Sequence, residues 1–194
     1  GISQFDVSIP AEHRKISDIF LPMPGEYNVL NATAAIALSC YMGVTIPHIK
    51  SALNDFAGVK RRFSIISDLN GIRVIDDYAH HPVEILAVLK AARSASSGRL
   101  IVVHQPHRYS RLEALFDDFC KCFNESDIVA ITNVYSAGEE VIEGFDRDRL
   151  VQGLKDHGHR SAHAIDDRLG LELFFRMHAK PGDIFVCLGA GSIS

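Results

Sequence analysis

A dense group of polar side chains lies at residues 76–82, whose sequence is DDYAHHP. Two carboxylates, a phenol and two imidazoles occur there directly after the apolar run Ile72–Ile75. Side chains of these types bind ligands, coordinate metals or transfer protons. Pro82 favours the start of a helix, because its missing N–H is not needed at the first helical position. The pattern predicts a strand, a turn that carries chemistry, and a helix.

Two further polar segments follow apolar runs in the same way. HQPHRYSR at residues 104–111 follows Leu100–Val103, and NVYSAGEE at residues 133–140 follows Ile128–Ile131. The carboxyl ends of parallel strands share one edge of a sheet, and ligands bind at that edge. We therefore expect the three polar segments to converge.

Arg108 and Arg111 are the main ligand-binding candidates in the second segment. Two guanidinium groups three residues apart, at the expected start of a helix, form a receptor for a carboxylate or a phosphate. Cations are mildly unfavourable at that end of the helix dipole, so their presence favours an anionic ligand. The alternative is a surface ion pair with Glu113 or Asp117, which would contribute little to stability.

The first two polar segments also contain four histidines, His80, His81, His104 and His107. Their spacing matches neither H-x-x-x-H nor H-E-x-x-H, and adjacent histidines in a loop rarely reach the same ion. We expect no metal site formed by the protein alone. His80 and His81 have a plainer alternative role as the N-terminal cap of the helix, with Glu84 favoured in its first turn.

An asparagine pair, Asn28 and Asn31, begins an alanine-rich helical pattern that ends near Met42. Asn28 is expected to be the N-cap of this helix. Asn31 lies one turn later on the same face and gains nothing from capping. Its amide offers a donor and an acceptor to a ligand.

The composition excludes several classes of protein. The chain has 194 residues, 47% hydrophobic and 23% charged, with a net charge of −4. It has no basic excess of the kind that binds nucleic acid. No apolar run approaches the roughly 18 residues that span a bilayer, so we expect a cytoplasmic protein without membrane contact. The cysteines lack the spacing of a zinc site and are expected to be reduced, buried thiols.

The order of the elements predicts an α/β fold in two parts, residues 1–57 and 58–194. Two strand patterns and two helical patterns precede a basic cluster at Gly58–Phe63, which marks the expected boundary. Beyond it, strand patterns alternate with helices of about 10 to 15 residues, which is typical of a doubly wound, mostly parallel sheet. The chain begins with Gly and ends soon after a strand pattern, so we expect it to be cut from a longer protein.

Five blocks of the sequence together resemble the Mur ligases of bacterial peptidoglycan synthesis. They are PGEYNVLNATAAIA (24–37), FAGVKRRF (56–63), DDYAHHPVEI (76–85), HQPHRYSR (104–111) and LGAGSI (188–193). DDYAHHP together with QPHRYSR is the most specific part of the resemblance. Within the family, these blocks point to the ligase that joins L-alanine to UDP-N-acetylmuramate.

The resemblance implies a three-domain enzyme with a UDP-sugar domain, an ATPase domain and a Rossmann-like domain that brings the amino acid. Residues 1–57 would be the tail of the ATPase domain, and residues 58–194 a truncated amino-acid-binding domain. ATP and Mg²⁺ are the implied cofactors. The carboxylate of UDP-N-acetylmuramate would form an acyl-phosphate, which the amine of L-alanine attacks. The missing N-terminal and central domains of the same chain would be partners.

The resemblance also assigns roles to residues, although it assigns no catalytic residue. Four would contact ATP, with the asparagines at the nucleotide, the arginine at the phosphates and the aspartate at the ribose: Asn28, Asn31, Arg62 and Asp77. Four would bind L-alanine, with the arginines at its carboxylate and the rings around its side chain: Tyr78, His80, Arg108 and Arg111.

Several positions depart from the family pattern, and two other functions stay open. The departures are Tyr27 for a common histidine, Val83 for threonine, His104 for phenylalanine and Ser192 for aspartate. The first alternative is the recycling ligase that joins a murein tripeptide to UDP-N-acetylmuramate. The second is a module that binds a nucleotide or another anion without catalysis.

The sequence contains no G-x-x-x-x-G-K-[ST] block, the loop that holds the phosphates of ATP in many ATPases. We therefore expect the chain alone neither to hydrolyse ATP nor to ligate L-alanine. The measurement is phosphate release by the purified chain with magnesium-ATP. Release above that of a heat-denatured sample would contradict this expectation.

Overall fold

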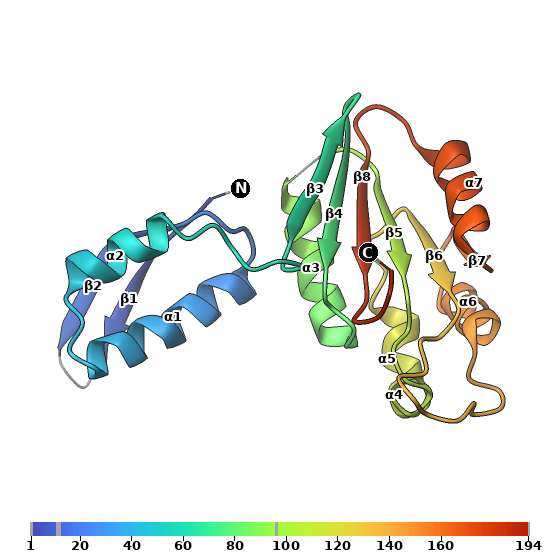
Figure 1. Cartoon of the computed structure of the whole chain (residues 1–194), viewed down its shortest axis with the longest axis horizontal. Coiled ribbons are helices and arrows are strands. Elements are labelled where there is room, and N and C mark those ends of the chain that lie inside the picture. Colours follow the sequence, from blue (N-terminus) through green and yellow to red (C-terminus); the bar gives the residue numbers. More distant parts are fainter. Residues whose placement is uncertain (1, 11–12, 96, 194) are drawn as a thin grey trace. The chain divides into compact units, whose positions relative to one another are not determined.

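The computed structural model describes residues 2–10, 13–95 and 97–193. It divides into two compact units, Gly1–Lys60 and Arg61–Ser194 (Figure 1). The sequence places the boundary slightly earlier, between residues 57 and 58. Gly58–Lys60 therefore belongs to the first compact unit.

The first unit packs two helices against a two-stranded antiparallel sheet. Its elements are β1 (Ser3–Ile9), β2 (Arg14–Leu21), α1 (Glu26–Tyr41) and α2 (Ile46–Asn54). Ile36 of α1 and Ile49 of α2 pack on Val7, Ile16 and Ile19 from the strands. Ile16 and Ile19 are three residues apart, and they share the buried side because β2 has one residue more than β1 between the pairs Phe5–Ile19 and Val7–Ile16, a β-bulge.

Helix α1 begins earlier than the sequence predicts. Gly25 is its N-cap, at φ 100°, a conformation that glycine adopts without a steric penalty. The expectation that Asn28 caps this helix is wrong, because Gly25 already turns the chain into it. Asn28 lies buried in the first turn, where its Nδ2 donates to the Pro24 carbonyl oxygen at 2.7 Å.

The second unit is built on one mixed sheet with the strand order β3-β4-β8-β5-β6-β7 within the described residues. The strands are β3 (Ser64–Leu69), β4 (Ile72–Asp77), β5 (Leu100–His104), β6 (Ile128–Thr132), β7 (Ala162–Ile165) and β8 (Ile184–Leu188). Strands β3 and β4 form an antiparallel hairpin, and the other neighbours pair in parallel. Asn70 and Gly71 turn the hairpin at φ 54° and 73°, as an Asn-Gly turn requires. The predicted doubly wound, mostly parallel sheet is confirmed.

Helices cover both faces of this sheet. They are α3 (Pro82–Ala95), α4 (Tyr109–Ala114), α5 (Phe116–Lys121), α6 (Arg147–Asp156) and α7 (Arg168–His178). Phe174 of α7 packs on one face with Ile101, Val103 and Phe185. Helices α3 and α5 lie behind the strands in Figure 1. The helix expected to start at Arg108 and Arg111 is short, since Leu115 at φ −121° separates α4 from α5.

Two other sequence expectations concern cysteines and membranes. Cys120 and Cys122 are buried free thiols, whereas Cys40 and Cys187 are free but only partly buried. Burial raises the pKa of the Cys120 and Cys187 thiols to about 11, so they stay protonated at neutral pH. In the part of the chain that the structure describes, no helix has the length and apolar character of a membrane span.

His104 is the last residue of β5, not the first residue of a polar loop as expected. It pairs with Leu188 in the parallel ladder and is fully buried against the rings of Phe119 and Phe123. Its Nδ1 is 3.2 Å from the Leu188 carbonyl oxygen, so Nδ1 carries the proton. Burial lowers the pKa of His104 to about 3, and the ring is neutral at physiological pH.

Replacing His104 by Phe should flatten the acid dependence of stability. Native His104 stays neutral down to about pH 3, whereas the unfolded imidazole protonates near pH 6.5. The unfolded state therefore binds the extra proton, and this costs up to about 1.4 kcal/mol of stability per pH unit below about pH 6.5. Urea unfolding should show a smaller loss from pH 7 to pH 5 in His104→Phe than in wild type.

The same comparison between pH 7.5 and 8.5 is the control, because the unfolded imidazole is then neutral in both proteins. The stability difference should be constant over that range. Equal slopes for the two proteins below pH 6.5 would show that His104 is not buried in its neutral form.

Candidate functional site

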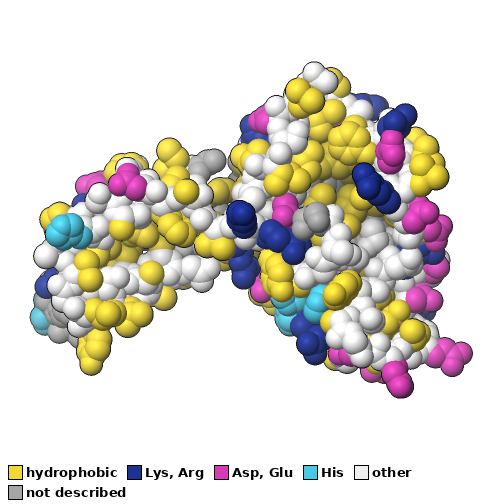
Figure 2. Space-filling view, in the orientation of Figure 1, with side chains coloured by type: hydrophobic (Ala, Val, Ile, Leu, Met, Phe, Trp, Pro, Cys, Tyr) yellow, Lys and Arg dark blue, Asp and Glu magenta, His cyan; other side chains and the backbone are white. Residues whose placement is uncertain are grey.

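The carboxyl ends of β4, β8, β5 and β6 lie side by side at one edge of the second unit, because these strands are neighbours and parallel. The segments that follow them are joined by backbone hydrogen bonds. Gln105 N donates to Leu188 O at 2.9 Å, and Arg108 N donates to Tyr135 O at 2.8 Å. The predicted convergence of the polar segments is confirmed. Figure 2 shows histidine and basic side chains gathered at the lower part of this unit.

A row of four rings crosses this edge. Tyr78 contacts His80 with ring centroids 5.4 Å apart, His80 lies 5.8 Å from His107, and His107 stacks on Tyr135 at 5.3 Å. We call these four residues the ring row. It is contributed by the segments after β4, β5 and β6. Tyr78 and Tyr135 are each about 40% exposed, so the row presents apolar surface to a ligand.

Arg111 lies next to the ring row. Its Nη1 is 3.2 Å from His107 Nδ1 and donates to the His107 carbonyl oxygen at 2.9 Å. These contacts hold one end of the guanidinium against the backbone and leave the rest of the group at the site.

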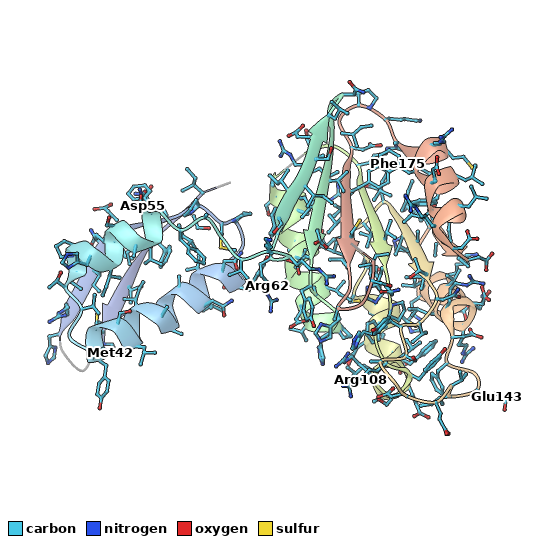
Figure 3. The ribbon with its side chains drawn as sticks, viewed as in Figure 1. Met42, Asp55, Arg62, Arg108, Glu143 and Phe175 are labelled. Atoms are coloured by element: carbon cyan, nitrogen blue, oxygen red, sulfur yellow. The ribbon has the colours of Figure 1, made fainter. Side chains whose placement is uncertain are left out.

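Arg108 is the N-cap residue of α4 and adopts φ 72°, a left-handed conformation that is uncommon for residues other than glycine. Such outliers concentrate at functional sites. Its Nη1 lies 3.7 Å from Glu139 Oε1, so the ion pair of Arg108 forms with Glu139 and not with Glu113 or Asp117, the partners considered as the alternative to a ligand. The Arg108 side chain is 51% exposed, and a long, exposed pair of this kind contributes little. Figure 3 places Arg108 at the lower end of the unit, near α4.

Glu139 is fixed by Ser110 at the start of α4. The Ser110 hydroxyl donates to Glu139 Oε1 at 2.7 Å, and the Ser110 N–H donates to Oε2 at 3.1 Å. These hydrogen bonds, more than the charge of Arg108, lower the pKa of Glu139. Glu139 is therefore a fixed anion that connects the segment after β6 to the segment after β5.

Asp77 is fully buried below the DDYAHHP turn. Its Oδ2 accepts from Phe63 N at 2.7 Å and its Oδ1 accepts from Ala79 N at 2.8 Å. Desolvation raises the pKa of this carboxyl. Asp77 has no exposed surface, so the structure does not offer its carboxylate to a ribose as expected. The carboxylate instead holds the turn against the segment that precedes β3.

Arg61 is a residue of the site that sequence reasoning missed. It donates to the carbonyl oxygens of Gly189 and Gly191, and its Nε lies 3.4 Å from Asp76 Oδ2. Its guanidinium also lies 5.1 Å from the centroid of the Tyr78 ring. Arg62, the residue that was expected at the phosphates, is exposed and lies 5.9 Å from the same centroid.

The other candidates take simpler positions. Glu84 Oε2 accepts from the backbone N–H groups of His80 and His81 at 3.1 and 3.3 Å, which confirms the capping role of this segment. Asn28 and Asn31 belong to the first unit, where Asn28 is buried and Asn31 is exposed. Across residues 2–10, 13–95 and 97–193, no group of three or more His, Cys, Asp or Glu is placed to hold a metal ion.

Comparison with known proteins matches residues 61–191 to the Mur ligase, glutamate ligase domain. Two proteins named UDP-N-acetylmuramate–L-alanine ligase are similar over all 194 residues: one from Dinoroseobacter shibae at 56% identity and one from a Jannaschia species at 57%. This chain spans 42% and 41% of their lengths.

Solved structures of two ligases are also similar to this chain. The UDP-N-acetylmuramate-alanine ligase of Thermotoga maritima has a TM-score of 0.75 at 33% identity, covering 92% of this chain and 37% of that one. A murein peptide ligase from Psychrobacter arcticus has a TM-score of 0.64 at 25% identity, covering 92% of this chain and 36% of that one.

Removing the Asp77 carboxylate should destabilise the second unit. Asp77→Ala leaves two buried N–H groups without an acceptor, which should lower the free energy of unfolding by about 2 to 4 kcal/mol. Asp77→Asn keeps one acceptor, so its loss should be roughly half as large. Urea unfolding of the chain measures both, and the amide protons of Phe63 and Ala79 should exchange faster in Asp77→Ala. The control is Asp68→Ala, which removes an exposed pair with Arg73 and should cost under about 1 kcal/mol. Equal costs at positions 77 and 68 would disprove the role of Asp77.

Proposed function

The chain belongs to the Mur ligase family, and from that premise we propose that it is part of an ATP-dependent ligase that joins L-alanine to UDP-N-acetylmuramate in the bacterial cytoplasm. The observation that carries this proposal is the position of Arg111 and Arg108 beside the ring row. The 56% identity over the whole chain with the UDP-N-acetylmuramate–L-alanine ligase of Dinoroseobacter shibae supports the choice of substrate.

This edge suits a small, free amino acid. A guanidinium binds a carboxylate through two parallel hydrogen bonds, which fixes the orientation of the amino acid as well as its charge. Tyr78 and His80 supply ring surface against which a methyl side chain packs. The amino group of the substrate is attached to the same carbon as the carboxylate and the methyl, so it would lie within reach of the ring row.

His80 has a suitable hydrogen-bonding form for that amino group. Its Nδ1 lies 3.0 Å from the Tyr78 carbonyl oxygen, so the neutral ring carries its proton on Nδ1. Nε2 then has a free lone pair and can accept a hydrogen bond from the amine. His80 would orient the amine before it attacks the activated carboxyl group.

Among the residues assigned to ATP, Asn31 in the first unit and Arg62 in the second are exposed, so each fits a contact with the nucleotide or its phosphates. Asn28 and Asp77 are instead engaged in hydrogen bonds within their own units. ATP supplies the phosphoryl group that activates the carboxylate, with Mg²⁺ neutralising its phosphates. We assign the Mg²⁺ ligands chiefly to the domains that the longer relatives have in addition.

A second candidate function is ligation of a murein peptide, which the similarity to the Psychrobacter arcticus protein favours. A full-length protein that contains this chain should distinguish the two. With ATP, Mg²⁺ and UDP-N-acetylmuramate, it should consume L-alanine with a higher kcat/KM than the tripeptide. A preference for the tripeptide would reassign the substrate, and no product from either would refute the ligase.

Arg111→Ala in the same protein should raise the KM for L-alanine about 10- to 100-fold, because it removes charge-assisted hydrogen bonds to the carboxylate. The KM for ATP should change by less than about twofold. Arg176→Ala, which removes an exposed pair with Glu172, is the control and should change neither value. Equal increases in both KM values would refute a role at the amino acid carboxylate.

A further inference from the structure

His107 is in contact with Arg111, and the proposed function gives it no role. Arg111 Nη1 makes two contacts with this one residue: it is 3.2 Å from His107 Nδ1 and 2.9 Å from the His107 carbonyl oxygen. A guanidinium only donates hydrogen bonds and does not lose its proton in proteins. His107 Nδ1 must therefore be an acceptor, and the proton of the neutral ring lies on Nε2.

The ring of His107 is held on both sides. It stacks on Tyr135 with an interplanar angle of 19°, and it contacts the tilted ring of His80. The backbone fixes the stacking, because Tyr135 N donates to Pro106 O and Arg108 N donates to Tyr135 O, both at 2.8 Å. The imidazole is therefore presented to Arg111 in one orientation.

The charges around His107 favour its neutral form. Arg111, Arg108, His80 and Glu139 are the charged or titratable groups that face it. Burial is the largest cause that lowers the pKa of His107, followed by Arg111, His80 and Arg108, and Glu139 alone opposes them. Protonation would place a second cation 3.2 Å from the guanidinium and would remove the acceptor.

The contacts at Nη1 also determine which edge of Arg111 remains for a ligand. Among the residues that the structure describes, His107 is the hydrogen-bond partner of the Arg111 side chain, through Nη1. The N–H groups of Nε and Nη2 point along one edge of the guanidinium and match the two oxygens of a carboxylate. His107 thus occupies one end of the group and leaves the bidentate edge open.

We propose that His107, as its neutral Nε2–H tautomer, is a positioning residue that holds Arg111 so that the Nε–Nη2 edge receives the carboxylate of the substrate amino acid. Tyr135 supports His107 by stacking on its ring. The inference about the carboxylate rests on the proposed function, whereas the tautomer and the contact with Arg111 do not.

The first test is made on the chain itself and needs no activity. Two-bond ¹H–¹⁵N spectra distinguish the imidazole tautomers, and loss of a signal in His107→Asn assigns it. At pH 7.5, His107 should show the Nε2–H tautomer, and it should titrate at a lower pH than an ordinary histidine. An Nδ1–H tautomer, or a charged ring at pH 7, would overturn the proposal.

The second test compares two variants in a full-length protein that contains this chain. His107→Leu removes the acceptor and should raise the KM for L-alanine about tenfold, with a smaller change in kcat. His107→Asn places Oδ1 near the position of Nδ1 and should restore most of the loss. A merely structural role predicts equal effects of both variants and an increase in the KM for ATP, and either result would overturn the proposal.

A double variant separates action through Arg111 from direct contact. His107→Leu should have almost no further effect on the KM for L-alanine when Arg111→Ala is already present, because the residue that it positions is gone. Additive effects would place His107 in independent contact with the substrate and would contradict a positioning role. A full-length protein that ligates no L-alanine at all would refute the proposed function. The tautomer measured on the chain would still show whether His107 accepts a hydrogen bond from Arg111.

Discussion

The candidate site depends on one constraint, the in-register parallel pairing of β8 with β4 on one side and β5 on the other. Leu188 pairs with both Asp77 and His104, so the three strands end at the same level. Beyond that level the chain segments must pass close together. A Cβ at Gly189 would lie 3.0 Å from the Gln105 carbonyl oxygen, and one at Gly191 would lie 2.4 Å from Gln105 Oε1. Only glycine fits this approach without movement of Gln105, which explains the L-G-A-G segment after β8.

Negatively and positively charged side chains lie at different depths at this edge. The carboxylates of Asp76 and Asp77 are buried beneath the turn, where Arg61 and backbone N–H groups contact them. The guanidinium groups of Arg108 and Arg111 lie with the ring row instead. Because the His107 ring accepts a hydrogen bond from Arg111 and is therefore neutral, the two arginines carry the positive charge beside it. The arrangement favours an anion attached to a small apolar group, such as the carboxylate of an amino acid.

Sequence patterns predicted the sheet and the convergence of the polar segments, because these follow from local periodicity and from the geometry of parallel strands. They failed for His104, since a polar residue at the end of a strand looks like the start of a loop. Its burial depends on Phe119 and Phe123, which come from α5 and the turn that follows it. Arg61 was missed for a similar reason, because its partners Gly189 and Gly191 lie about 130 residues away. The burial of Asp77 likewise depends on the Phe63 N–H, which no local pattern of residues 76–82 contains.

A crystal structure of a full-length protein that contains this chain, with L-alanine bound, would show directly which group holds the substrate carboxylate. We expect the carboxylate of L-alanine to lie about 3 Å from Nε and Nη2 of Arg111, with its methyl group against Tyr78 and His80. Electron density for a nucleotide phosphate at Arg108 and Arg111, or for L-alanine away from the ring row, would contradict this expectation.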